Sequence, residues 1–181
     1  MSEIYEIHGK TRTVRELLFN QKYAIDYYQR EYKWETKHVQ ELIDDLFNKF
    51  FDFYQPNHER TQVAQYGHYF LGSIIISSRN GQKYIIDGQQ RMTTLTLLLI
   101  YLNNLQKKND STKKIKLDDL IYSEKFGQKS FNIDVDERAT CMEHLFNGEY
   151  PDVTEAPESV RNIVARYGNI MEYFPEELQD K

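Results

Sequence analysis

Residues 83–102 read KYIIDGQQRMTTLTLLLIYL, and this run sets the architecture expected of the chain. Lys83 to Ile86 have the apolar, β-branched and aromatic character of a strand. Asp87 and Gly88 then supply a tight turn. Met92 to Leu105 are apolar on nearly every side, which predicts a helix buried at the centre of the domain.

A hairpin is expected directly before this helix. The dipeptide Asn80-Gly81 favours a two-residue turn, because both positions tolerate positive φ. Residues 69–77 are rich in isoleucine and aromatic side chains and predict a buried strand, antiparallel to residues 83–86. Two further strands are expected, at Tyr23–Ile25 and at Lys129–Asp134.

Helical patterns occupy much of the remaining sequence. A capping box at Thr13 and Glu16 predicts a short helix through Phe19. Apolar side chains at helical spacing predict three more helices, which begin near Thr36, Asp136 and Val160. Polar loops are expected over residues 55–65 and between Pro151 and Pro157. We therefore expect an α+β fold, with a small mixed or antiparallel sheet packed with several helices and a helical C-terminal part.

Two regions are expected within this fold. Residues 1–108 would form the core that carries the polar turn, and residues 109–181 a strand plus a helical extension. The extension would pack on the core or lead into a further C-terminal domain.

Composition narrows the classes of protein. The chain has 181 residues, of which 40% are hydrophobic and 28% charged, which suits one globular domain. It has no apolar run long enough for a membrane span and no secretory signal at its start. The single cysteine, Cys141, falls on an amphipathic helix and is expected to be a core residue; together these features predict a cytoplasmic protein. The net charge of −5 argues against a polycation that wraps DNA.

The turn 87–91 is the strongest candidate site. It lies at a strand end, and the first amides of the following helix have no intrahelical acceptors and favour an anion. Gly88 leaves the backbone open to a ligand. The side chains that we expect to converge on one phosphate are Gln89, Gln90, Arg91, Thr93 and Thr94.

Asp87 needs a separate explanation, because a carboxylate beside a phosphate is repulsive. It fits if it binds a bridging divalent cation, positions a water or accepts a hydrogen bond from a sugar hydroxyl. The alternative is that Asp87 only caps the helix and that the neighbouring side chains are solvated.

Tyr28-Gln29-Arg30 forms a second candidate, followed by Tyr32 and Trp34. Arg30 would supply another cationic arm while the rings stack on a base. The alternative is structural: the rings pack on the helix that begins near Thr36, and Arg30 forms an ion pair. The sequence has no Gly-x-x-x-x-Gly-Lys-Ser/Thr loop, which excludes a P-loop NTPase on pattern, and its histidines have no paired metal spacing.

Two motifs resemble those of one bacterial family. Residues 28–34, YQREYKW, and residues 85–95, IIDGQQRMTTL, resemble the paired motifs of the N-terminal domain of GmrSD-type (type IV) restriction endonucleases, within the ParB/sulfiredoxin-like superfamily. The segment 71–74, expected as a strand, resembles the family in order and spacing. The resemblance implies a domain that binds and hydrolyses nucleoside triphosphates, with Mg²⁺ or another divalent cation, coupled to cleavage of modified phage DNA.

The resemblance also implies residue roles. Catalytic roles fall to Asp87, Gln90 and Arg91, and Asp87 is the candidate ligand for the cation. The residues expected to bind the nucleotide or its phosphates are Tyr28, Gln29, Arg30, Gly88, Gln89, Arg91, Thr93 and Thr94. Nothing here resembles the family's HNH-type nuclease, so this active site is expected in a C-terminal domain or subunit that is a partner of this chain. A homo-oligomer is a further expected arrangement.

Two rival functions stay open at this point. One is a non-catalytic ParB-like module whose arginines grip DNA phosphates. The other is a protein-interaction domain that has lost its chemistry.

Overall fold

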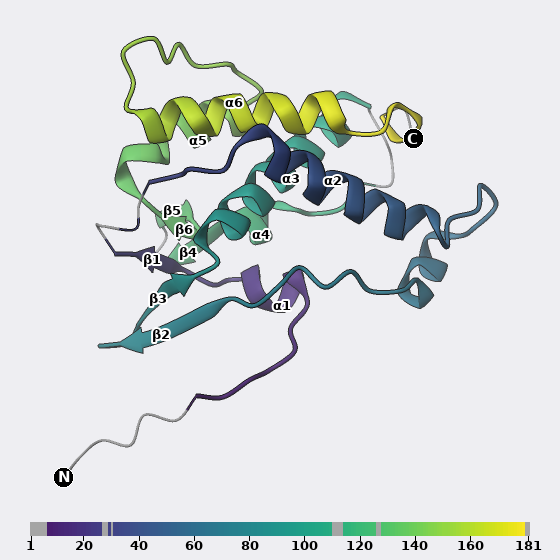
Figure 1. The fold of residues 1–181 in the computed structure, drawn as a ribbon, viewed down its shortest axis with the longest axis horizontal. Helices are drawn as coiled ribbons and strands as arrows, with labels where there is room; N and C mark the ends of the chain where they lie inside the picture. Colours follow the sequence, from purple (N-terminus) through teal and green to yellow (C-terminus); the bar gives the residue numbers. More distant parts are fainter. Residues whose placement is uncertain (1–6, 27–28, 30, 110–113, 126–127, 180–181) are drawn as a thin grey trace.

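The computed structural model describes residues 7–26, 29, 31–109, 114–125 and 128–179. These residues form an α+β fold, as predicted (Figure 1). The main sheet is mixed, with the strand order β2-β3-β1-β6. Its strands are these: β1 Tyr23–Ile25, β2 Ile75–Arg79, β3 Gln82–Asp87 and β6 Ile133–Asp134.

The predicted hairpin joins β2 to β3. Asn80 and Gly81 both have positive φ, at 50° and 75°, which confirms the two-residue turn. The prediction for residues 69–77 was wrong in its bounds and its burial. The strand starts only at Ile75, because Gly72 has a φ of 103° and bends the backbone before it, and Ile75 is 54% exposed because β2 forms an outer edge of the sheet.

Three strands of the sheet run parallel, because β1 pairs in parallel with both β3 and β6. Their carboxyl ends therefore lie at one edge of the sheet. The strand predicted over Lys129–Asp134 is divided at Asn132, whose Nδ2 donates to the carbonyl oxygens of Leu18 and Leu120, both at 2.8 Å. The residues before Asn132 form β5 (Gln128–Phe131), which pairs antiparallel with the unpredicted β4 (Tyr122–Lys125).

The predicted helices are present. Figure 1 shows the long helices α2, α3, α5 and α6 above the strands in that view. The α-helices are α1 Val14–Leu18, α2 Thr36–Phe51, α3 Gln89–Lys108, α4 Asp118–Ile121, α5 Asp136–Phe146 and α6 Glu158–Tyr173. The described residues also include the 3₁₀ helices η2 Arg60–Gln65 and η3 Glu176–Leu178. The capping box that begins α1 is confirmed, whereas α4 and the 3₁₀ turn in the loop 55–65 were not predicted.

The core surrounds α3, as its sequence predicts. Leu97 and Ile100 of α3 are fully buried and pack in one cluster with α2, α5 and α6. Cys141 belongs to this cluster at 5% exposure, and burial raises the pKa of its thiol to about 11. It is therefore a core residue, as expected. Among the described residues no helix is both long and apolar enough to cross a membrane.

Candidate functional site

The polar motif occupies the end of β3 and the first turn of α3. Gly88 is the N-cap of the helix, with a φ of 90°. A Cβ at this position would lie 2.9 Å from the Cγ1 atom of Ile74, so both the backbone conformation and the available space require glycine. Within the described residues no side chain caps this helix end. Its first amides are therefore directed toward the edge of the sheet with no intrahelical acceptors.

Arg91 is held against the backbone that precedes β2. Its Nη2 donates to the carbonyl oxygen of Ser73 at 2.6 Å and lies 3.6 Å from Oδ2 of Asp87. A Cβ on Gly72 would lie 2.3 Å from Nη1 of Arg91, so this glycine leaves the room that the guanidinium fills. The Arg91 side chain is 28% exposed, so its orientation is fixed while part of it faces solvent.

Gln90 joins the two sequence motifs. Its Oε1 accepts a hydrogen bond from the amide of Lys33 at 2.9 Å, and its Nε2 donates to the carbonyl oxygen of Glu31 at 2.8 Å. Nearby, Nε2 of Gln29 donates to the carbonyl oxygen of Ile86 at 3.2 Å. The structure thus brings Gln29 and residues 31–33 beside the end of β3 and the start of α3. Tyr28 and Arg30 lie outside the described residues, so their roles stay predictions.

Thr94 also contacts this loop, through Tyr32. It is fully buried, and its hydroxyl donates to the carbonyl oxygen of Gln90 at 2.9 Å and lies 2.8 Å from the hydroxyl of Tyr32. Tyr32 is 1% exposed, and burial raises the pKa of its hydroxyl to about 12. The Thr94 hydroxyl therefore positions the Tyr32 loop.

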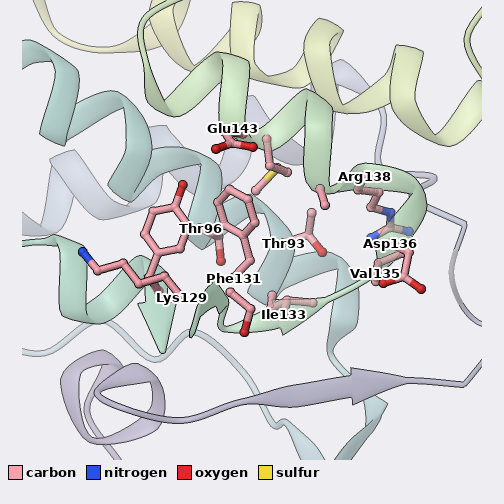
Figure 2. Close-up of a pocket in the computed structure, with 13 residues that line it drawn as sticks. Thr93, Thr96, Lys129, Phe131, Ile133, Val135, Asp136, Arg138 and Glu143 are labelled. Atoms are coloured by element: carbon pink, nitrogen blue, oxygen red, sulfur yellow. The ribbon is translucent and has the colours of Figure 1, made fainter. Parts of the chain in front are cut away.

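Thr93 faces a different region from Arg91. Two positions along an α-helix separate side chains by about 160° around the axis. Thr93 lines a cavity of about 290 Å³ between α3, the β5–β6 segment and α5, whose lining includes none of residues 87–91 (Figure 2). Thr93 and Arg91 therefore do not point toward a single phosphate, contrary to the prediction.

A second strand-to-helix turn repeats the pattern of the first. Residues 134–138 read DVDER and begin at the last residue of β6, just as residues 87–91, DGQQR, begin at the last residue of β3. The helices α3 and α5 thus start at the same edge of the sheet, each with an arginine as its third residue. Arg138 was not predicted as a functional residue, although the Asp-x-x-x-Arg spacing repeated at the ends of two strands was a usable signal.

Arg138 is 5% exposed and connects α5 to the loop beside Gln90. Its Nε donates to Oγ of Ser159 at 3.1 Å, and the same Oγ accepts from the amide of Tyr32 at 3.3 Å. Acidic residues, Asp136 and Glu137, occupy the first turn of α5 where α3 has glutamines. Carboxylates there satisfy the helix dipole, so α3 is the better anion site of the two.

A divalent cation would have one protein carboxylate available at the α3 turn. Asp87 has a side chain 61% exposed beside the helix N-terminus. Mg²⁺ typically takes one or two carboxylates and completes its shell with water and substrate phosphates, so Asp87 fits a cation carried by a nucleotide. Across the described ranges, no group of three or more His, Cys, Asp or Glu side chains is placed to hold a metal by itself.

The fold and the paired motifs define a class of small α+β domain in which a loop with one buried tyrosine, Tyr32, is hydrogen-bonded to an uncapped helix N-terminus. Residues 14–179 match the family described as GmrSD restriction endonuclease, N-terminal domain, and the chain belongs to this family. Membership of this family implies a domain of a restriction endonuclease. Comparison with curated proteins gives no match.

Proposed function

We propose that this domain binds and hydrolyses a nucleoside triphosphate where residues 31–33 meet the N-terminus of α3. The observation that carries the proposal is the pair of hydrogen bonds that Gln90 makes with this loop: it accepts one from the amide of Lys33 and donates one to the carbonyl oxygen of Glu31. They bring both motifs of the family to one place, at the carboxyl edge of the parallel strands. Ligands of open α/β sheets bind at such edges.

The phosphates would lie on the first amides of α3. Arg91 would contribute its guanidinium, which has several N–H groups, of which the bond to Ser73 occupies only part. The residue is already oriented by Gly72 and Ser73, so little side-chain entropy would be lost on binding. Gln90 acts by holding the loop in place.

Asp87 would hold the cation that accompanies the triphosphate or orient the attacking water. Bound Mg²⁺ would neutralise part of the negative charge of the phosphates. The carboxylate lies 3.6 Å from Nη2 of Arg91, so the two groups already form one charged pair at the helix end.

In the whole protein, the nucleotide site would control a C-terminal HNH-type nuclease domain or subunit that cleaves modified phage DNA in the cytoplasm. Family membership supports the DNA substrate and the separate nuclease domain. Hydrolysis of the nucleotide would permit the nuclease to cleave DNA.

The test is a thermal-shift panel of ATP, GTP, CTP and UTP, with and without Mg²⁺, followed by phosphate release. Asp87→Asn and Arg91→Ala should abolish hydrolysis, whereas Asp44→Asn, an exposed carboxylate on α2, should not change it. Equal turnover in all four proteins would refute the proposal. Binding to DNA with a steep salt dependence, and no stabilisation by any nucleotide, would instead identify a DNA-binding module.

A further inference from the structure

The cavity beside α3 has the composition of a small-molecule site. It holds about 290 Å³, near the lower end of ligand pockets, which begin at about 300 Å³. Phe131 and Met142 give it apolar walls, and both side chains are more than nine-tenths buried. Figure 2 shows Thr93 in the middle of the lining, with Lys129 at one end and Asp136 with Arg138 at the other.

Thr93 provides the observation that points to an occupant. It is 3% exposed, and within the described part of the chain its hydroxyl has no hydrogen-bond partner. Thr96, one turn further along the same wall, has its hydroxyl bonded to the carbonyl oxygen of Met92 at 3.0 Å. A buried hydroxyl without a partner costs free energy, and a ligand in the cavity would satisfy it.

The cavity shares helix α3 with the candidate phosphate site, although Thr93 and Arg91 lie about 160° apart around the helix axis. Thr93 lies five positions after Gly88, the N-cap of α3, which corresponds to a rise of about 7.5 Å along the helix. Arg138 of the cavity wall shares the hydroxyl of Ser159 with the amide of Tyr32, in the loop that Gln90 holds. The two regions therefore have a helix and a hydrogen-bonded loop in common.

We propose that this cavity receives the nucleoside of the triphosphate whose phosphates lie at the start of α3; this inference rests on the proposed function. The base packs against Phe131 and Met142, and Thr93 donates a hydrogen bond to it. Asp136 and Glu143 in the lining supply carboxylates that accept from sugar hydroxyls. The cavity, rather than the polar turn, would then determine which nucleotide is preferred.

The test separates the nucleoside from the phosphates by comparing nucleoside triphosphates with inorganic triphosphate, both titrated with Mg²⁺. Thr93→Val keeps the shape of the side chain and removes the hydroxyl. It should weaken binding of the preferred nucleoside triphosphate about tenfold and leave inorganic triphosphate unchanged. Thr96→Val is the matched control, because its hydroxyl is bonded within the helix, and it should leave both affinities unchanged.

A second variant fills the cavity instead. Ala139→Leu adds bulk to the α5 wall at an exposed position, which favours correct folding. It should lower affinity for the nucleoside triphosphate to that of inorganic triphosphate.

The outcomes distinguish this inference from the proposed function. If both variants bind nucleoside triphosphates as the parent does, the cavity is not the nucleoside site, while the phosphate site stands. If the parent binds neither nucleoside nor inorganic triphosphate, both proposals fall.

Discussion

Replacing Gln90 by alanine tests whether this side chain holds the loop in the free protein. Its amide group makes two hydrogen bonds, to the amide of Lys33 and to the carbonyl oxygen of Glu31, at 2.9 and 2.8 Å. The partners are backbone groups in a partly solvated loop, so water would replace part of what is lost. We expect Gln90→Ala to lower the free energy of unfolding by about 1–2 kcal/mol. For a domain of this size that corresponds to a fall in Tm of about 2–8 °C.

The assay is thermal unfolding without nucleotide, followed by circular dichroism. Gln89→Ala is the matched control, because Gln89 lies in the same helical turn and the described residues give its side chain no hydrogen bond. That variant should stay within about 0.5 kcal/mol of the parent. An unchanged or raised Tm for Gln90→Ala would refute the reasoning, and would show that the side chain serves a ligand alone.

Two further predictions concern the same region. Gly72→Ala and Gly81→Ala should each lower the free energy of unfolding, measured in urea, by about 1–2 kcal/mol, because both residues have positive φ. Only Gly72→Ala should also weaken triphosphate binding, because its Cβ would displace Arg91, whereas a Cβ at Gly81 would meet no atom within 4 Å. Equal binding by both variants would contradict this. Tyr32→Phe should cost about 1 kcal/mol at pH 7 through the lost bond to Thr94. Burial raises the pKa of Tyr32 from 10.0 to about 12, so the stability that the neutral hydroxyl gives the parent below pH 10 is lost as the pH rises toward 12. In denaturant titrations, the difference in unfolding free energy between the parent and Tyr32→Phe should therefore shrink over this pH range. A difference that does not change with pH would contradict this prediction.

Local signals predicted the parts of the fold that depend on few residues. The Asn80-Gly81 turn, the Thr13 cap and the amphipathic helices follow from near neighbours, and all are present. The start of β2 was misplaced because the turn at Gly72 accommodates Arg91, which is distant in sequence. The division at Asn132 depends on carbonyl oxygens of Leu18 and Leu120, which no local pattern reveals.

The candidate site was predictable in place but not in detail. The strand, turn and helix around residues 87–91 are where the sequence indicates. Which groups face a ligand depends on helical phase and on residues 31–33. Gln90 is engaged by that loop, and Thr93 faces the cavity. Arg138 contributes through the sheet order, which brings β6 beside β1.

The burial of Cys141 has a practical consequence for studying this protein. Its thiol is 5% exposed with a pKa of about 11, so at neutral pH it is protonated and shielded from electrophiles. A cysteine introduced on the exposed surface, at Lys33 for example, would therefore react with a maleimide fluorophore in preference to the native one. The unaltered chain thus offers a natural background for single-site labelling, and a fluorophore at position 33 would test the proposed binding of a nucleotide beside this loop.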